Sequence, residues 1–590
     1  DNHNKNNYGA IPSPSYTYSD DLSLGASTLT TASTMGAPKL ISIDQAINEA
    51  LAEDVTPHPN IMRIRQPQPT HQTRLFVGTA LLFLVDSMEK TILAVLSRAL
   101  DEHVEWFHER YVAYAGLWGA LVGAVVWGTL GDAWGRQIVT TYVSWIVTIF
   151  SLLTAILVGW SNSTASSYNG LDNDTIQSSS SNSSNNNNNT FMVEALLISR
   201  CLVGFGLGGI TVPYDLLAEW LANETTNSNH HHHPKDDRHD QRRAPGLLMI
   251  HAFWSIGSLL VFGLLETHTA LSPQAGQLTG TELWFCTVPA ILATFVLTTG
   301  NHDGNDVGVL ESPRFLLAQG RQDEALKVLR LAAKASGKDV NQIFPESIPI
   351  ILYSKESPAP ALSTTYLPTT SATASPWNGL FTLVSWQWMK LASALLFTYL
   401  GQAFCYQATA AMLVCVFDEK NHGQKYQAGL SAFLELVGIG LLMLVVDRVG
   451  RVTTQLAAYA MGSVACLTLA LWFSLPFLEN GNVLICLALL ARMLIFGGGC
   501  VTWISTTEVL TAGIRTTGHA IAGMAGRIGA FGGTLMFPDF QDIPLLALII
   551  FGVSFGVAIA VGDIPETRMK EMGRSYALLG QSERWIRNRR

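Results

Sequence analysis

Charged residues inside apolar segments carry the clearest chemical signal. Asp86 and Arg200 lie about 18 Å and about 14 Å into the first and fourth apolar segments, at 1.5 Å per helical residue. Charges at this depth are costly and are usually functional. A carboxylate paired with an arginine acts as a proton switch, because protonation removes its charge and releases the arginine. We therefore predict an Asp86–Arg200 pair for proton coupling, with Glu89 on the same face sharing the proton. A purely structural pair is one alternative, and neutralisation of Glu89 by Lys90 is another.

Other apolar segments carry polar and aromatic residues near mid-depth. Arg527 is able to hold a carboxylate through two hydrogen bonds or to pair with Glu435, and both interpretations remain open. Pockets for organic solutes combine apolar walls with a few polar groups. The predicted substrate-binding residues are Trp254, Gln402, Tyr406, Glu435, Arg492, Trp503 and Arg527. For each aromatic or amide residue, core packing or lipid contact is the alternative.

Apolar segments of membrane-spanning length position these residues. A helix needs about 20 apolar residues to cross the hydrocarbon core, and the chain has six such segments before a long polar stretch and six after it. They begin near Leu75, Tyr111, Ile138, Phe191, Gly246, Leu283, Trp386, Tyr426, Thr453, Val483, Gly518 and Ile543. The sequence therefore predicts an all-α polytopic membrane protein with twelve transmembrane helices in two pseudo-symmetric six-helix bundles.

The predicted boundaries follow composition. They are a disordered cytosolic tail over 1–73, a first bundle over 74–300, a cytosolic linker over 301–385, a second bundle over 386–562 and a cytosolic tail over 563–590. Apolar residues at helical spacing predict a short linker helix over 321–336, with Gly337 as its stop. Low-complexity inserts interrupt the first bundle at 161–190 and 222–243. The first insert contains glycosylation sequons at Asn162, Asn173, Asn182 and Asn188.

Composition and charge support insertion in a membrane. Charged residues make up 14% of the chain, against about 25% in soluble domains. The distribution of Lys and Arg among the loops places both termini in the cytosol, with the protein in the plasma membrane or a vesicle membrane. The seven cysteines show no CxxC spacing and are interpreted as buried thiols. The tract His230–His233 is interpreted as solvated, so no metal site is predicted.

The two halves repeat each other. Arg200-Cys-Leu-Val-Gly204 in the fourth segment is echoed by Arg492-Met-Leu-Ile-Phe-Gly497 in the tenth. The loop Gly128-Thr-Leu-Gly-Asp132-Ala-Trp-Gly135-Arg136 is echoed by Asp447-Arg-Val-Gly-Arg451. Such weak internal symmetry is typical of duplicated transporter halves, and it argues against a channel or a receptor bundle.

These strings resemble the loop motifs of the major facilitator superfamily, in its sugar-porter and organic-ion branch. Glu311-Ser-Pro-Arg-Phe-Leu-Leu and Pro565-Glu-Thr-Arg strengthen the resemblance. Asp86-Ser-Met-Glu89, Leu202-Val-Gly-Phe-Gly-Leu-Gly-Gly and Phe253-Trp-Ser-Ile-Gly257 are similar to the synaptic vesicle two-related branch. The chain departs from that pattern at Met443 and His251.

The resemblance implies a cytosolic lock that bridges the halves when that side is closed. Glu219 with Arg243 would extend it in the first half, and Glu508 with Arg515 in the second. The implied gate residues are Gly128, Asp132, Gly135, Arg136, Glu219, Arg243, Asp447, Arg451, Glu508 and Arg515. A solvated loop that only sets topology is the alternative.

The expected function is secondary transport of a small organic solute, more specifically an organic anion, coupled to protons. A sugar symporter or uniporter is one alternative, and a non-transporting vesicle or surface receptor or regulator of the same fold is another. Glycine-rich runs fall within helices rather than in a strand–loop–helix unit, and there is no catalytic constellation. We therefore expect no enzyme, no cofactor and no nucleic-acid partner, and we expect a monomer in the lipid bilayer.

Overall fold

The computed structural model describes most of the apolar chain and its linker. The described residues are 39–51, 71–101, 110–169, 182–221, 243–271, 280–300, 308–353, 377–419, 427–474, 481–536 and 542–567. The insert at 222–242, including His230–His233, and the sequon at Asn173 lie outside them.

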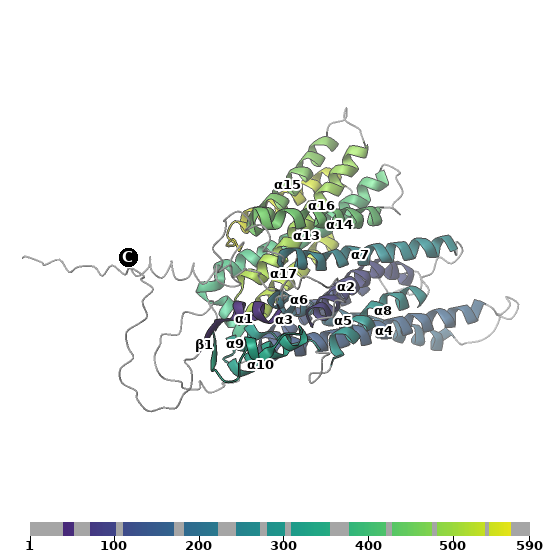
Figure 1. Ribbon diagram of the computed structural model, residues 1–590. Coiled ribbons are helices and arrows are strands. Elements are labelled where there is room, and N and C mark those ends of the chain that lie inside the picture. The colour runs from purple at the N-terminus through teal and green to yellow at the C-terminus, as the bar shows by residue number, and fades with distance from the viewer. Residues whose placement is uncertain are drawn as a thin grey trace, which may run out of the picture.

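In the described part of the chain, twelve spans form two bundles, which are coloured purple to teal and green to yellow in Figure 1. The first half contains α2 (His71–Asp101), α3 (Arg110–Trp134), α4 (Arg136–Asn169), α5 (Asn182–Gly208) continued by α6 (Thr211–Trp220), α7 (Arg243–Leu271) and α8 (Gly280–Thr298). The second half contains α13 (Trp386–Glu419), α14 (Gln427–Val449), α15 (Arg451–Phe473), α16 (Gly481–Val509), α17 (Arg515–Met536) and α18 (Ile543–Val561). The predicted fold class is confirmed.

Hydropathy alone does not identify every span. In the described part of the chain, nine helical stretches are long and apolar enough to cross a membrane, and α8 forms a shorter apolar helix. Neither α2 nor α17 is among the nine. Helix α2 carries Asp86, Glu89 and Lys90, and α17 is rich in glycine and threonine. The two long spans outside the nine are therefore those that carry the candidate functional charges Asp86 and Arg527.

Glycine allows close packing of neighbouring spans. A Cβ added to Gly204 of α5 would lie 2.0 Å from the carbonyl oxygen of Gly116 on α3, and one added to Gly123 would lie 2.1 Å from that of Phe205. Such close approach needs small residues. Span four bends at Gly209, whose N–H donates to the carbonyl of Gly206. The halves meet along two pairs of spans, α3 with α17 and α7 with α14.

Helices and strands outside the spans gather at one end of the bundles (Figure 1). They are β1 (Lys39–Ser42), α1 (Ile43–Leu51), α9 (Pro313–Ala318), α10 (Gln322–Ala335), α11 (Val340–Ile343) and β2 (Ile350–Tyr353), here called the cap. Helix α12 (Asn378–Val384) precedes α13. We call this end of the molecule the linker end. The predicted linker helix corresponds to α10, which is capped by Arg321 and Ser336 and is followed by Gly337 at φ +74°.

Two sequence predictions are wrong here. The tail over 1–73 is not disordered throughout, because β1 pairs in parallel with β2, with Lys39 opposite Ile350. The linker also contains more than one helix. Both differences have the same cause: the buried face of α1, with Ile43 and Ile47, joins Leu329 of α10 in one apolar cluster. Burial of that surface stabilises segments that are too short to be stable alone.

The insert at 161–190 is partly helical. Helix α4 continues to Asn169 and α5 begins at Asn182, so the sequons at Asn162, Asn182 and Asn188 have helical backbone. Ser and Asn are poor helix formers. Extending an existing helix adds one hydrogen bond per residue, which accounts for helices that run past the apolar segments.

Candidate solute pathway and gate

Asp86 of α2 meets Lys90 rather than Arg200. The Lys90 Nζ lies 2.9 Å from Oδ2 of Asp86, one turn along the same helix. The other oxygen, Oδ1, is buried and has no hydrogen-bond partner among the described residues. Lys90 also lies over the Trp254 ring, 4.3 Å from its centroid. Asp86 and Lys90 interact electrostatically with Arg527 of α17, in the other half.

Arg200 of α5 pairs with Glu89, so the predicted Asp86–Arg200 pair is wrong. Its Nη1 donates to Oε2 of Glu89 at 2.6 Å, and Ser151 of α4 donates to Oε1 at 2.7 Å. The helix turns by about 100° per residue, so Glu89 points toward α4 and α5 while Asp86 does not. Glu89 and Arg200 are fully buried within one half. They therefore form an internal brace.

Glu435 of α14 pairs with Arg492, so of the two interpretations of Arg527 the pairing with Glu435 is not the one the structure shows. The Arg492 Nε lies 3.1 Å from Oε1 of Glu435, and the guanidinium stacks over the Tyr406 ring at 4.1 Å. Tyr406 and Ser255 donate to the two Glu435 oxygens, each at 3.2 Å. Because Ser255 belongs to α7, this network crosses between the halves.

Arg527 reaches across the molecule in another way. Its Nη2 donates to the carbonyl oxygen of Leu207, at the end of α5, at 2.9 Å. Gln402 packs against α16, where a Cβ on Gly499 would lie 2.3 Å from the Gln402 Nε2. Trp254 connects the Lys90 cluster to the network around Glu435, because its ring lies under Lys90 and its side chain is hydrogen-bonded to Tyr406.

Trp503 belongs to a layer of rings below this centre, toward the linker end. The layer consists of Phe83, Tyr214, His251, Tyr399, Trp503 and His519, with neighbouring centroids 4.8–6.3 Å apart. Phe83 precedes Asp86 on α2, and α2 begins at the linker end. The ring layer therefore lies between Asp86 and the linker end. Edge-to-face rings pack densely, so the layer separates the centre from the linker end.

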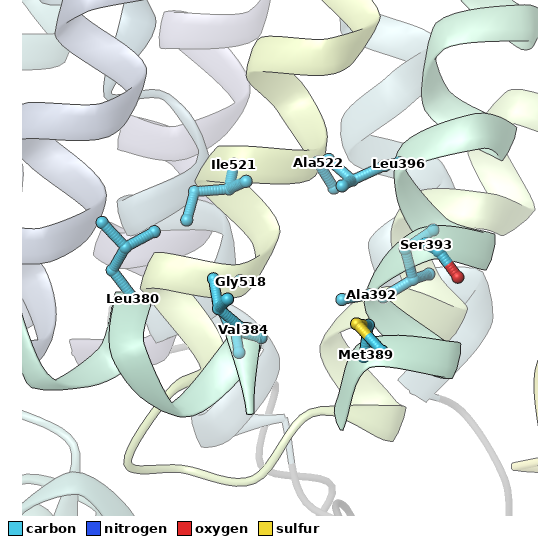
Figure 2. A pocket seen from close by; sticks show the side chains of 11 residues that line it. Leu380, Val384, Met389, Ala392, Ser393, Leu396, Gly518, Ile521 and Ala522 are labelled. Atoms are coloured by element: carbon cyan, nitrogen blue, oxygen red, sulfur yellow. The ribbon is translucent and has the colours of Figure 1, made fainter. Parts of the chain in front are cut away.

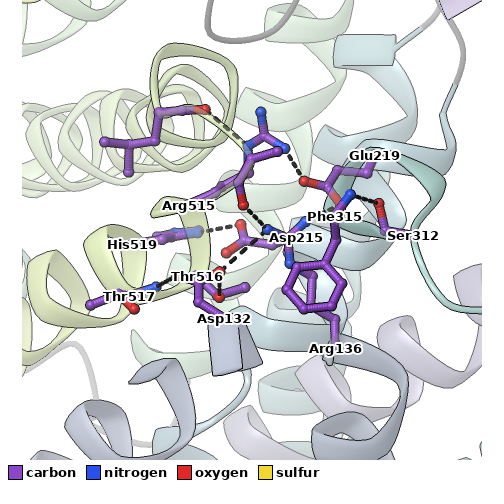
Figure 3. A network of polar contacts seen from close by, with 12 residues as sticks. Asp132, Arg136, Asp215, Glu219, Ser312, Phe315, Arg515, Thr516, Thr517 and His519 are labelled. Atoms are coloured by element: carbon purple, nitrogen blue, oxygen red, sulfur yellow. Dashed lines mark hydrogen bonds and ion pairs between the residues drawn. The ribbon is translucent and has the colours of Figure 1, made fainter. Parts of the chain in front are cut away.

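One carboxylate joins the halves at the linker end. Glu219 of α6 pairs with Arg136 of α4 and with Arg515 of α17 (Figure 3). All three side chains are fully buried. The Arg515 Nε donates to the carbonyl oxygens of Thr507 and Leu510 at 2.8 and 3.1 Å. Those bonds fix the guanidinium so that its terminal nitrogens face Glu219.

Asp132 of α3 forms a second connection beside it. It accepts from the Thr517 backbone N–H at 2.8 Å and from the Thr516 hydroxyl, both on α17. Arg136 lies 3.3 Å from Asp132 and donates to the carbonyl of Ala512 at 2.5 Å. A Cβ on Gly128 would lie 2.3 Å from that of Ala520, so glycine permits this approach of α3 and α17. Figure 3 shows the contacts between the two halves.

The corresponding charges of the second half stay within it. Arg451 pairs with Asp447 at 3.0 Å and with Glu508 at 3.1 Å. The predicted Glu508–Arg515 pair is therefore wrong, because Arg515 is directed toward Glu219. The side chain of Arg243 lies outside the described residues.

Two glutamates that the sequence analysis gave no role cap equivalent helices. Glu311 accepts from the Gln137 backbone N–H at 3.0 Å at the start of α4. Glu566 accepts from the N–H groups of Arg451 and Val452 at 2.9 and 3.0 Å at the start of α15. Gly135 and Gly450 precede these helices with φ +115° and +112°, a conformation that favours glycine. Comparing the loops after spans six and twelve would have revealed the pair.

An apolar groove of about 190 Å³ lies between α12, α13 and α17 (Figure 2). Its walls include Leu383, Met389 and Ile521. None of the charged residues described above lines it. It is therefore separate from the candidate pathway.

Solved structures share this architecture. The xylose transporter XylE from E. coli, in a structure described as the proton:xylose symporter bound to 6-bromo-6-deoxy-D-glucose, aligns with a TM-score of 0.60. The alignment covers 86% of this chain and 99% of that chain at 16% identity, which shows a shared fold. Twelve spans in two related bundles are thus the fold that the described part of this chain shares with that protein.

Sequence comparison gives the family. The profile described as "Sugar (and other) transporter" matches residues 111–570, and the chain belongs to this family. It is 24% identical to Organic cation/carnitine transporter 7 of Arabidopsis thaliana, over 76% of this chain and 81% of the relative. It is 22% identical to the Synaptic vesicle 2-related protein of Xenopus laevis, over 78% of this chain and 71% of the relative. The protein is thus a multi-pass membrane protein of a transporter family.

Proposed function

We propose that the protein is a secondary transporter that moves a small organic anion by alternating access, in symport with protons. The observation that supports this most directly is the central charge cluster. Lys90 and Arg527, from different halves, both interact with the single carboxylate of Asp86. One positive charge is left over for a carboxylate ligand, and Trp254 beside Lys90 offers an aromatic surface.

Lys90, rather than Arg492, supplies the surplus positive charge near Asp86. Arg492 is balanced by Glu435 and contributes no surplus charge. Lys90 takes its place, with a side chain that is 49% exposed. A neutral sugar would leave the surplus charge unmatched in a setting where unpaired cations are costly.

Asp86 is the proposed proton site. Its Oδ1 has no partner among the described residues, so a proton is able to bind there without displacing a hydrogen bond. Protonation would weaken its hold on Lys90 and Arg527, and proton and solute occupancy would thereby be linked. Both oxygens of Glu89 already accept hydrogen bonds, from Ser151 and from Arg200, so we assign the proton to Asp86 rather than to Glu89.

The orientation of the protein in the membrane follows from the loop charges. With both termini in the cytosol, the linker end is the cytosolic end, and the contacts of Glu219 and Asp132 close that side. Strand β1 lies before the first span and β2 lies after the sixth. Because the two strands pair, they must lie on the same side of the membrane, which agrees with the even number of spans between them. The vesicle or plasma membrane remains the proposed location.

The test is ligand-induced thermal stabilisation of the purified protein with matched aromatic acids and amides, such as phenylacetate and phenylacetamide. A ligand that binds only the folded state raises the unfolding temperature, and the rise grows with the ratio of its concentration to Kd. We expect stabilisation by the acid, lost in Arg527→Lys because a point charge cannot reproduce a bidentate contact. Equal effects of acid and amide would reject the anion assignment.

A second candidate substrate class is a zwitterion or cation. The relative named for organic cations and carnitine favours it, as do the acidic groups Asp86 and Glu435. Carnitine and choline in the same panel distinguish the classes. Stabilisation by choline, together with no stabilisation by phenylacetate, would support a cation as substrate. Xylose in the panel tests the sugar alternative. Binding without uptake into proteoliposomes would favour a receptor or regulator.

A further inference from the structure

A buried histidine and aspartate meet between the two halves, close to the gate. Nδ1 of His519, on α17, lies 2.7 Å from Oδ1 of Asp215, on α6 (Figure 3). Both side chains are fully buried. The remaining polar atoms, Nε2 of His519 and Oδ2 of Asp215, have no hydrogen-bond partner among the described residues. Each side chain therefore has the other as its polar contact, across an interface that must open during transport.

Acidic groups outnumber the arginines around the pair. Asp215 and Glu219 of α6 and Asp132 of α3 face Arg136 of α4 and Arg515 of α17. Glu311 at the rim adds a further acid near Arg136, whereas Asp44 of the cap, which also acts on Arg515, is balanced by Arg314. A proton on His519 reduces this excess of acids and makes its contact with Asp215 an ion pair.

The other titratable groups nearby do not provide that charge. Glu508 of α16 has its own partner in Arg451, and Glu311 at the rim accepts backbone N–H groups. Tyr214 of α6, Tyr399 of α13 and His251 of α7 are in the ring layer, and the His251 Nδ1 contacts the Leu247 carbonyl at 3.1 Å. Helix α12 has no titratable residue.

We propose that His519 and Asp215 form a proton-binding latch that holds the linker end closed and releases its proton when the halves part. In the closed state the proton lies on the imidazole and is balanced by the Asp215 carboxylate. Opening would place His519 on one half and Asp215 on the other, each in water. The imidazole then loses the charge that favours its protonated form, and the proton leaves to solvent at the linker end.

The sign of the pH dependence follows by linkage. The closed state binds one more proton than the open state, so lowering the pH favours closure. One proton changes the ratio of closed to open molecules by at most about tenfold per pH unit. The latch requires the alternating access of the proposed function, but it depends neither on the substrate nor on Asp86.

The test measures the gate without any solute. Spin labels are attached at Trp134→Cys and Trp386→Cys, two exposed positions at the linker ends of α3 and α13, in a chain whose seven native cysteines are replaced. Pulsed electron–electron double resonance then gives the distance between the two labels at pH values from about 8 to 5, the range in which histidine titrates. The short-distance population is expected to grow as the pH falls. A single distance that is independent of pH in the parent overturns the proposal, whatever the variants do.

Variants assign the proton. His519→Gln and Asp215→Asn are each expected to abolish the pH dependence of the short-distance population. The size of that population in either variant does not matter for the test. His251→Gln is the matched control, because His251 is a second buried histidine of the same layer and its Nδ1 contacts the Leu247 carbonyl oxygen rather than a carboxylate. This variant is expected to keep the pH dependence. An unchanged pH dependence in His519→Gln, or its loss in His251→Gln alone, overturns the assignment. Absence of anion transport leaves this readout unaffected.

Discussion

Glu219 accepts ion pairs from Arg136 of its own half and from Arg515 of the other half, and all three side chains are shielded from solvent. A single carboxylate therefore holds two buried cations from different parts of the molecule. If the halves separate, Arg515 loses its acidic partner, whereas Arg136 keeps both Glu219 and Asp132. The closed linker end is accordingly sensitive to this one side chain.

Glu219→Gln is expected to destabilise the closed linker end strongly. Removing one partner of a buried ion pair costs about 3–5 kcal/mol, because the remaining charge is left uncompensated. The distance between labels at Trp134→Cys and Trp386→Cys should increase, and the thermal unfolding midpoint should fall. Glu508→Gln is the matched control, since Glu508 pairs with Arg451 inside the second half: it should lower the midpoint without changing the distance. Similar distances in both variants would contradict the gate.

Asp86→Asn is expected to abolish uphill accumulation and to preserve exchange. The amide cannot bind the coupling proton, and it leaves Lys90 and Arg527 without their carboxylate. The measurement is uptake of the best ligand of the acid–amide panel into proteoliposomes, with and without a proton gradient. Glu89→Gln should instead impair folding, because it breaks the brace to Arg200. Gradient-driven uptake at the parent's level in Asp86→Asn would refute proton coupling at this site.

Glu566→Ala is expected to lower stability by about 1 kcal/mol, the usual cost of losing a helix cap. The two N–H groups at the start of α15 would lose their acceptor. These contacts lie within the second half, so the gate distance should not change. The thermal unfolding midpoint tests the loss of stability, and the distance between the labels at Trp134→Cys and Trp386→Cys tests the effect on the gate. A longer distance with an unchanged midpoint would argue against a capping role.

Glu311→Gln is expected to flatten the dependence of stability on pH. Burial raises the pKa of the Glu311 carboxyl above its ordinary value of 4.5. The folded state therefore binds this proton more tightly than the unfolded state, and stability falls as the pH rises from 4.5 through the raised pKa. Glutamine keeps an oxygen acceptor for the Gln137 N–H but has no charge to bury. The measurement is the thermal unfolding midpoint of the parent and of Glu311→Gln across this pH range. As the pH rises, the midpoint of the variant should rise relative to that of the parent. A difference in midpoint that does not change with pH would contradict the role of the buried charge.

Spans were predictable because apolar length is a strong signal, and α10 because its apolar residues recur at helical spacing. The partners of charged residues were harder to predict. Asp86 and Glu89 are three residues apart on one helix, and sequence spacing does not reveal which of them faces Arg200. Arg515 turns to Glu219 rather than Glu508 because carbonyls at the end of α16 orient its guanidinium. His519 and Asp215 gave no signal, since neither belongs to the motifs that carried the resemblance.

Pairing of β1 with β2 also has a consequence for the order of synthesis. Strand β1, at Lys39–Ser42, is translated before any span, whereas its partner, at Ile350–Tyr353, follows the sixth. A four-residue strand has no ladder until that partner has been translated. The cap therefore forms only after the first six helices have been made. Its completion marks the first half as an assembled unit while the second half is still being made.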